Sequence, residues 1–487
     1  MVKLRILFDT NVIIALEDDR KVDEVTGTFY REASKSSVFL VHPKSIDDIN
    51  RDKNSLRLEK TLSKTLKYDT LENAPEPDQE FLDRIRVNVT PNDLVDSYLL
   101  YALYRKCVNF LITEDNGIRK KARVLGIQEQ VLTIQQASEL FSVLSRRVLP
   151  KHPFVQTLPV YSLDLQDSFF DSLRESYPEF NDWFGRISAE GRRSWVLIDQ
   201  KKIQAICIYN EEREHSDSSK IPLPTLKLNT FKVSERYSGK KISELLLKMA
   251  FQYVIDNNLK SLFLTTFPEN ISLRYVIEDF GLMDIGRKGR EIIFVKTMII
   301  PSQVPEGMTA VSYAIKFYPN FLDDPEIRKF LVPIQPVFHD RLFPDCPGQQ
   351  HTSPLDLTQL APEGNTIKKA YICNSNTNKI REGDLLLFYR SHDRKEVTSI
   401  GIVEKTIRTN NPLEIASVVS NRTVYNLEEI KQLASRTALV LIFRHLKYLD
   451  EAVKMEQLEK KYKIRGPIQS IREITHNEYK EIVGDTK

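Results

Sequence analysis

The chain has 487 residues, of which 41% are hydrophobic and 28% charged, and its formal net charge is +3. It is too long for one core, and a prior of about 150 residues per domain suggests roughly three domains. The four cysteines are far apart and include no C-x-x-C pair, which argues against a disulfide framework or a zinc site. No apolar run is long enough to span a membrane, so we expect a cytoplasmic protein without a membrane partner.

The first predicted strand covers residues 4–8, an apolar run that stops at Asp9, Thr10 and Asn11. Open α/β sheets keep their functional sites at the carboxyl ends of strands. Asp9 is therefore the first candidate site residue.

Residues 38–41 predict a second strand, and Ser45 is expected to cap a helix that begins at Ile46. Asp47 and Asp48 then lie in the first turn of this helix, where the helix dipole favours negative charge. Helix capping and metal binding are equally good explanations for either residue, and which of the two would be the second acid of a site stays open.

Residues 92–103 have the apolar spacing of a helix, with Asp93 as its expected cap and Asp96 facing the sheet. A further strand at 110–113 ends close to Asp115. Acids that converge at one edge of a sheet repel one another unless cations hold them, which favours a site for a hard divalent metal ion.

The order of these segments resembles the PIN domain, a family of metal-dependent ribonucleases, over residues 1–148. The resemblance rests on F-D-T-N at 8–11, Asp48-Ile49, Asp96-x-x-Leu-Leu-x-Ala and Leu-Ile-Thr-x-Asp at 111–115. It implies an α/β/α fold with a parallel sheet and catalytic residues Asp9, Asp48, Asp96 and Asp115. Asp9, Asp96 and Asp115 would bind Mg²⁺ or Mn²⁺, with Thr10, Asn11 and Thr113 orienting ligands or water. The metal ions would activate a water molecule against a phosphodiester, so no protein nucleophile is needed.

Residues 155–300 alternate β-rich runs with helical segments. The expected strands are 194–198, 203–209, 226–233, 261–266 and 292–296, and the expected helices are 242–257 and 270–280, the latter ended by Gly281. A glycine turn at 236–241 leads from a strand into a helix, and such a helix N-terminus is an anion site because its backbone N–H groups point outward.

This second pattern resembles the GNAT acetyltransferases, whose R/Q-x-x-G-x-G/A turn holds the pyrophosphate of acetyl-CoA. Arg236 and Gly239 match that motif, but Lys241 stands where a small residue is usual. Ile277 takes the place of the usual tyrosine acid, which leaves turnover open. The resemblance implies a mixed sheet with helices and a cofactor site made of Val233, Arg236, Tyr237, Ser238, Gly239, Lys240, Lys241 and Asn270.

Residues 301–366 are expected to form a connector, and the short strands expected within 367–487 suggest a small β-barrel. The G-D-L-L-L-F-Y run at 383–389, the Ile400-Gly401-Ile402-Val403 strand and residues 465–470 resemble the PUA-like group with its ASCH and EVE branches, which bind RNA or modified bases. Basic residues interleaved with Tyr448 and Tyr462 suit phosphate contact and base stacking, and an ordinary solvated surface explains them equally well.

The sequence therefore predicts a multidomain α/β and α+β protein. The main hypothesis is a metal-dependent endoribonuclease acting on structured RNA such as tRNA, coupled to an acetyl-CoA-binding domain and an RNA-recognition domain. The alternatives are an acetyltransferase of RNA, aminoacyl-tRNA or protein with a scaffold PIN domain, and a non-catalytic RNA-binding adaptor. By analogy with toxin and defence proteins, an antitoxin or other regulatory protein is a candidate partner, and a homo-oligomer stays open.

Overall fold

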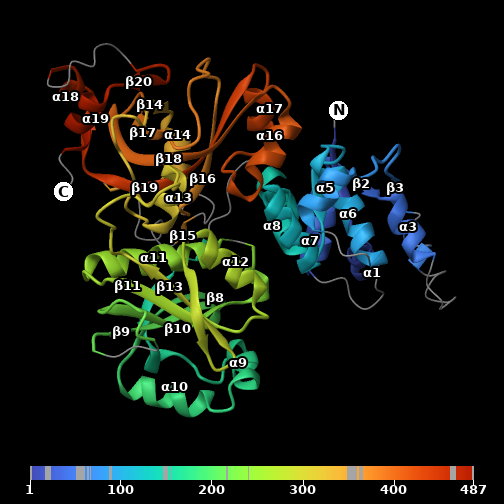
Figure 1. Ribbon diagram of the computed structural model, residues 1–487, viewed down its shortest axis with the longest axis horizontal. Coiled ribbons are helices and arrows are strands. Elements are labelled where there is room, and N and C mark those ends of the chain that lie inside the picture. The colour runs from blue at the N-terminus through green and yellow to red at the C-terminus, as the bar shows by residue number, and fades with distance from the viewer. Residues whose placement is uncertain are drawn as a thin grey trace. The chain divides into compact units, whose positions relative to one another are not determined.

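The computed structural model describes residues 3–16, 24–50, 61–62, 65, 67–86, 90–145, 152–153, 155–214, 218–239, 241–347, 359–360, 366–460 and 468–484. It has two compact units, the first made of residues 1–149 and 408–438 and the second of residues 150–407 and 439–487. Figure 1 labels their helices and strands. Within the described residues, none of the helices combines the length and the apolar character that crossing a bilayer would need.

The first unit is built on a five-stranded sheet in which the strand order is β3-β2-β1-β4-β5 and all neighbours are parallel. The strands are β1 (Leu4–Phe8), β2 (Ser37–Val41), β3 (Asp69–Thr70), β4 (Phe110–Ile112) and β5 (Val131–Leu132). The helices are α1 (Thr10–Leu16), α2 (Glu24–Ala33), α3 (Pro43–Ile49), α5 (Gln79–Ile85), α6 (Pro91–Tyr104), α7 (Asn116–Leu125) and α8 (Ile134–Ser145). The expected parallel sheet is present: β4 is apolar and fully buried, and β1 is buried except for the exposed Arg5, as strands covered on both faces usually are.

Two helices of this unit begin earlier than the sequence predicted, each at a proline. Proline suits the first helical position because its φ angle is already helical and its missing N–H would have no partner there. The N-caps of α3 and α6 are consequently His42 and Thr90, so the predictions of Ser45 and Asp93 as caps were wrong.

Residues 408–438 leave the C-terminal part of the chain and pack within the first unit. They form α16 (Pro412–Val419), a short 3₁₀ turn, η5 (Ser420–Arg422), and α17 (Leu427–Leu433). The Ser420 hydroxyl donates to the Glu129 carbonyl at 2.6 Å, and Lys106 forms an ion pair with Glu414 at 2.8 Å. We expected residues 367–487 to form one continuous domain. This excursion interrupts them, because it begins at the end of strand β18 (Glu396–Thr409) and ends at the start of strand β19 (Ala438–Lys454).

The second unit contains a seven-stranded sheet ordered β12-β13-β11-β10-β9-β8-β7. Its strands are β7 (Gln156–Pro159), β8 (Arg193–Asp199), β9 (Lys202–Glu212), β10 (Thr225–Val233), β11 (Ser261–Thr266), β12 (Met283–Lys288) and β13 (Glu291–Thr297). Only β10 and β11 are parallel neighbours. The expected strands and the glycine stop are present, whereas β7 and β12 were not predicted.

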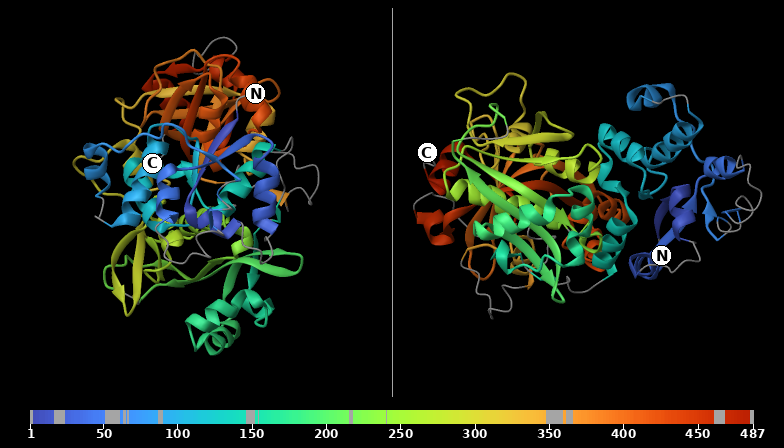
Figure 2. Two further views of the ribbon diagram at one scale, coloured as in Figure 1. Left: turned by 90° about the vertical axis from the view of Figure 1, so that its right-hand side faces the viewer. Right: turned by 90° about the horizontal axis from the view of Figure 1, so that it is seen from below.

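Helices cover both faces of this sheet. α9 (Asp171–Ser176) and α10 (Phe180–Ala189) lie at the far end of the unit in Figure 1 and in the left view of Figure 2, and α10 packs on the face that carries Ile206 and Ile208. α11 (Ile242–Asp256) and α12 (Ile271–Asp279) pack on the opposite face. Alternate residues of β9 supply the two faces, as the period of a strand requires.

The C-terminal part of this unit is a six-stranded sheet ordered β16-β19-β18-β17-β14-β20. Its strands are β14 (Lys329–Ile334), β16 (Lys368–Cys373), β17 (Leu385–Arg390), β18 (Glu396–Thr409), β19 (Ala438–Lys454) and β20 (Arg472–Ile474), with helices α13 (Ala310–Lys316), α14 (Pro336–Leu342), α18 (Met455–Lys460) and α19 (His476–Val483). Residues 301–366 therefore supply β14 and are more than a connector. The pairings within the described residues leave β16 and β20 at the edges, so the small barrel stays a prediction.

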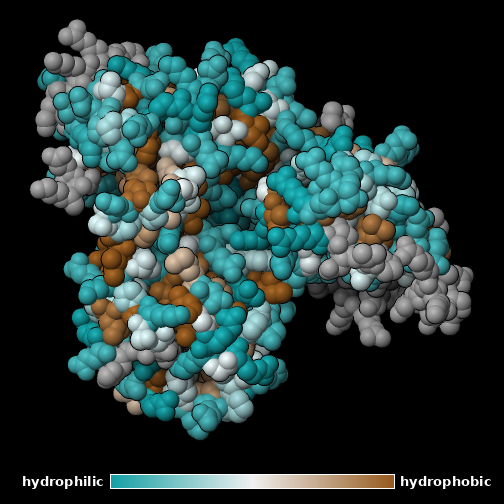
Figure 3. All heavy atoms as spheres, in the orientation of Figure 1, coloured by the Kyte–Doolittle hydropathy of each residue, from teal (hydrophilic) through white to brown (hydrophobic). Residues whose placement is uncertain are grey.

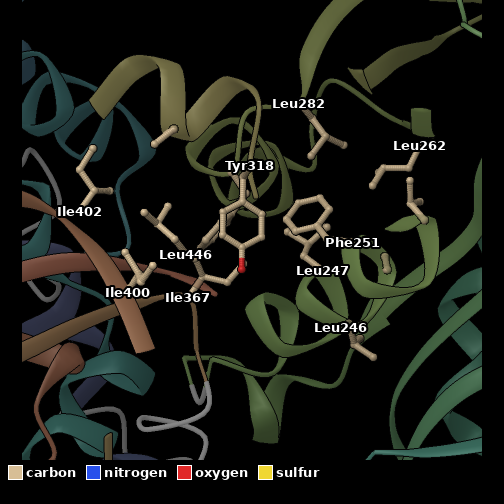
Figure 4. Packing of buried hydrophobic residues seen from close by; sticks show 14 of the residues in the cluster. Leu246, Leu247, Phe251, Leu262, Leu282, Tyr318, Ile367, Ile400, Ile402 and Leu446 are labelled. Atoms are coloured by element: carbon tan, nitrogen blue, oxygen red, sulfur yellow. The ribbon is translucent and has the colours of Figure 1, made fainter. Parts of the chain in front are cut away.

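One hydrophobic core joins the two sheets of the second unit. Leu246, Leu247 and Phe251 of α11 lie in the same cluster as Ile400 and Ile402 of β18 (Figure 4). The fully buried Lys296 ammonium donates to the carbonyls of Phe280, Ile315 and Lys316, at 3.1, 2.8 and 3.0 Å. The acetyltransferase-like and C-terminal parts therefore fold as one body, and their exterior is mostly hydrophilic on the face seen in Figure 3.

Candidate functional sites

The predicted acids of the first unit gather at the carboxyl ends of β1 and β4. Asp9 is buried directly after β1, and its carboxylate accepts a hydrogen bond from the Thr113 hydroxyl at 2.7 Å. The Asp115 backbone N–H donates to the same hydroxyl at 2.9 Å, and the Asp115 carboxylate accepts from the Ile118 N–H, which caps α7. Thr113 thus fixes Asp9 relative to Asp115, and its role in orienting metal ligands or water stays a prediction.

Electrostatics show that three of the acids lie close enough to repel one another. Burial raises the pKa of Asp9, and the charge of Asp115 raises it further. Burial also raises the pKa of Asp96, and together with Asp9 and Asp115 it brings that pKa to about 7, although Lys121 acts in the opposite direction. Asp96 on α6 therefore faces the sheet, as its position in the sequence indicated.

The remaining predicted residues of this site are Thr10, Asn11 and Asp48. The backbone N–H groups of Thr10 and Asn11 bond the Asp9 carboxylate and oppose the rise in its pKa without cancelling it, while the Asn11 side chain is exposed. Asp48 lies partly buried on α3, and its neighbour Asp47 is exposed and paired with Lys44 at 3.4 Å. Among the described residues, no group of three or more His, Cys, Asp or Glu side chains is arranged to hold a metal ion.

The second candidate site is the place where β10 separates from β11. The two strands pair only from Thr225 to Leu228, whereas β10 continues beside β9 as far as Val233. A β-bulge between Leu228 and Thr230 marks the point of departure, and bulges bend a strand in this way. The β11-facing backbone of residues 229–233 is thereby left without a neighbouring strand among the residues that the structure describes.

A tight turn follows and opens α11. Gly239 has φ 78° and Lys241 has φ 60°, both in the left-handed region, which costs little at glycine and more at lysine. Lys241 is the N-cap of α11 and provides no side-chain cap, so N–H groups of the first turn stay available to an anion. The Lys241 ammonium lies 3.5 Å from the Glu244 carboxylate, so the two form an ion pair within the first turn of the helix.

The other predicted cofactor residues are distributed around this turn. Tyr237 is buried and its hydroxyl donates to Asp199 at 2.8 Å, so its side chain anchors the turn to the β8–β9 hairpin. Asn270 precedes α12 and donates to the Thr266 hydroxyl at 3.0 Å. Val233 is partly buried at the end of β10 and Ser238 is exposed; Lys240 and the Arg236 side chain lie outside the described residues. Ile277 is fully buried in the core and supplies no acid.

A third group of residues escaped the sequence analysis. The Tyr177 hydroxyl donates to the Glu291 carboxylate at 2.6 Å, and the Thr265 hydroxyl donates to the other oxygen of that carboxylate at 2.9 Å. Burial, followed by the bond to Glu291, raises the pKa of Tyr177. These residues come from distant segments without a shared motif, so no local signal could have grouped them.

In the C-terminal part, residues that the sequence suggested for contact with nucleic acid bond other residues of the protein instead. The Tyr448 hydroxyl donates to Asp345 at 2.6 Å, and Lys248 of α11 donates to the same carboxylate at 2.5 Å. Arg444 is buried and paired with Glu404 at 2.9 Å. Tyr448 and Arg444 therefore contribute to the interior of the second unit, and Tyr462 lies outside the described residues.

Comparisons with known proteins agree with part of this picture. Residues 158–282 match the model of the acetyltransferase (GNAT) family, and residues 362–463 match a domain of unknown function, DUF365. This match confirms a GNAT-type domain in the middle of the chain, whereas no family match supports the PIN resemblance. No curated protein matches the chain.

Many solved structures are similar to parts of the chain, and three of them illustrate the range. One is ASCH from Zymomonas mobilis, at 11% identity and TM-score 0.26, covering 33% of this chain and 96% of that one. Another is a putative acetyltransferase of the GNAT family from Desulfovibrio desulfuricans, at 16% identity and TM-score 0.24, covering 29% and 98%. The third is the NatC complex bound to Gag peptide and CoA, at 13% identity and TM-score 0.21, covering 29% and 96%. Likeness at this level indicates no particular activity.

Proposed function

We propose that residues 155–300 bind acetyl-CoA and transfer its acetyl group to an acceptor. The observation that carries this proposal is the separation of β10 from β11 directly before the turn that opens α11, inside the region that matches the GNAT family. The unpaired backbone of residues 229–233 can bond the amides of the cofactor's arm as an added strand would. The N–H groups at the start of α11 can take its diphosphate.

The transfer itself needs a nucleophile placed at the thioester carbonyl. Holding both reactants in one site supplies much of the rate by proximity and orientation. Because Ile277 replaces the phenol of the family motif, the leaving thiolate is expected to take its proton from water or from another group. A thiolate is a modest base, so this loss is tolerable.

Titration of acetyl-CoA into the full-length protein tests the cofactor site. Gly239→Val is expected to weaken binding by about tenfold or more, because a branched side chain at this left-handed φ moves the turn away from the diphosphate. Gly191→Val is the matched control: Gly191 also has a left-handed φ, 68°, but lies at the β8 end of the domain. Equal affinities for acetyl-CoA in the wild type and both variants, or no binding at all, would contradict the proposal.

A second candidate activity belongs to the first unit. The mutual repulsion of Asp9, Asp96 and Asp115 at the carboxyl ends of parallel strands favours metal-dependent hydrolysis of a phosphodiester, with Mg²⁺ or Mn²⁺ as the cation. The three carboxylates are not arranged as a metal site among the described residues, so holding the cation would require Asp9, Asp96 and Asp115 to move closer together, with Asp48 completing the acidic set. Structured RNA is then the proposed substrate.

A further inference from the structure

Three charged side chains of α11 follow one another along the helix, starting at the proposed cofactor turn. Lys241 is the N-cap of the helix, Glu244 lies in its first turn, and Lys248 follows one turn later. Residues three or four positions apart are neighbours on the surface of a helix, so Glu244 is within reach of either lysine. In the structure, the Glu244 carboxylate forms its ion pair with Lys241, at 3.5 Å.

Glu244 is almost completely buried, although it lies at the start of the helix. Its exposed fraction is 4%. A buried carboxylate needs a cation close to it, because an uncompensated charge away from water is costly. An anion that takes Lys241 away from Glu244 therefore leaves this carboxylate in need of another cation. Glu244 thus opposes the binding of a diphosphate at the turn unless Lys248 replaces Lys241.

Lys248, however, is held by the C-terminal part of the same unit. Its ammonium donates to one oxygen of Asp345 at 2.5 Å, and the Tyr448 hydroxyl of β19 donates to the other oxygen at 2.6 Å. Burial opposes the ionisation of Asp345, but the charge of Lys248 acts in the other direction and the pKa of this carboxyl lies well below its ordinary value. Asp345 is therefore an anion that competes with Glu244 for Lys248.

Helix geometry allows these four charges two arrangements, and we call the four residues the charge relay. The first arrangement pairs Lys241 with Glu244 and Lys248 with Asp345, as the structure shows. In the second, Lys248 pairs with Glu244, and Lys241 is available to an anion at the turn. A glutamate four positions before a lysine is the favourable order for an ion pair on a helix. The hold of Asp345 on Lys248 decides between the two arrangements.

We propose that Asp345 lowers the affinity of the α11 turn for the diphosphate of acetyl-CoA, because it holds Lys248 and so leaves Lys241 to Glu244. Neutralisation of Asp345, or a competing cation bound to it, releases Lys241 to the cofactor. The C-terminal part thereby regulates the acetyltransferase-like part through α11. This inference rests on the proposed binding of acetyl-CoA.

Calorimetric titration of CoA into the full-length protein tests the charge relay. Asp345→Asn is expected to tighten CoA binding by about fivefold, the lower end of typical couplings between sites. Such a gain cannot come from damage to the fold, which would weaken binding. Asp256→Asn is the matched control and should leave the Kd unchanged. Asp256 is exposed at the other end of α11, where it accepts from the neutral Gln252 side chain.

Two second-site variants separate the charge relay from the simple loss of a negative charge. In a Lys248→Met background, Asp345→Asn should give no gain, because no lysine is left at this position to pair with Glu244. In Glu244→Gln, Lys241 is already released, so CoA should bind more tightly than to the wild type and Asp345→Asn should add nothing. An unchanged or weakened affinity of Asp345→Asn, or a gain that persists in either background, would overturn the inference.

Inorganic pyrophosphate separates failure of this inference from failure of the proposed function, because it carries the diphosphate charge without the thioester arm. If CoA binds to none of these proteins while pyrophosphate shows the expected pattern of gains, the charge relay stands and acetyl-CoA binding fails. If CoA binds the wild type and Asp345→Asn equally well, the charge relay fails and the cofactor site stands. Binding of neither probe overturns both.

Discussion

Replacing residues 410–437 with a short Gly-Ser linker should destroy the cooperative unfolding of the first unit while the second unit still folds. The excised helix α16 buries Leu413, Ile415 and Val419. At about 1.5–3 kcal/mol for each buried aliphatic side chain, their loss is comparable with the whole stability of a domain. Ser420 and Arg422, which hold Glu129, would be lost as well. The strands β18 and β19 remain joined by the linker.

Point variants give the same test without a deletion. Ile415→Ala is expected to lower the free energy of unfolding of the first unit by about 2–4 kcal/mol, because Ile415 is fully buried. Glu428→Ala on α17 should have almost no effect, since its pair with Lys431 is on the surface. A fragment of residues 1–149 that unfolds as cooperatively as the same region in the full chain would show that the excursion is dispensable.

Asp96→Asn is expected to stabilise the first unit at pH 8, with a gain that shrinks as the pH is lowered through 7 towards 4. The pKa of Asp96 is raised to about 7, so between the ordinary value near 3.8 and about 7 the folded state holds more protons than the unfolded state. Stability then falls as pH rises through this window, and the full cost of the charged form is present above pH 7. Asparagine carries no charge and avoids that cost.

The gain should be roughly 1–2 kcal/mol, after a discount for solvent screening of this partly exposed group, or a few degrees in Tm. Circular dichroism melts at pH 4, 6 and 8 measure it, with Asp69→Asn on the exposed edge strand β3 as the control. A Tm difference between Asp96→Asn and wild type that does not vary with pH would contradict the electrostatic account.

The same variant tests the metal proposal. At pH 8, Mn²⁺ should raise the Tm of the wild type and have little effect on Asp96→Asn, because a ligand that binds only the folded state stabilises it. Labelled structured RNA should be cut by the wild type with Mn²⁺ and left intact by the variant. Absence of both effects would leave the acids as a repelling cluster without a hydrolytic role.

Much of the fold could be predicted where the hydrophobic residues recur with the period of a strand or helix and a residue such as glycine marks the end of the element. Apart from β12, the strands and helices of residues 193–297 followed from alternation and from Gly281, whose φ of 84° ends α12 as glycine allows. Helix starts were less predictable where a polar residue competed with a proline, as at Ser45 and Pro43. Elements with few buried residues, such as β12 and α9, carry little pattern and were missed.

The candidate sites differ in how far the sequence could predict them. Asp9, Asp96 and Asp115 could be grouped because parallel strands bring their carboxyl ends to one edge of a sheet. Tyr177 and Glu291 are 114 positions apart, and only the tertiary packing of the segment after α9 against β13 brings them together. For the same reason, the excursion of residues 408–438 has no signature in composition or spacing.

Hydrogen–deuterium exchange of the full-length protein with saturating CoA tests the central claim most directly. If the cofactor bridges the opening between β10 and β11, amides of residues 229–233 and of the first turn of α11 should exchange more slowly, with little change on α9 and α10. Protection that is absent from these two segments, or confined to other parts of the chain, would contradict the acyl-transfer account.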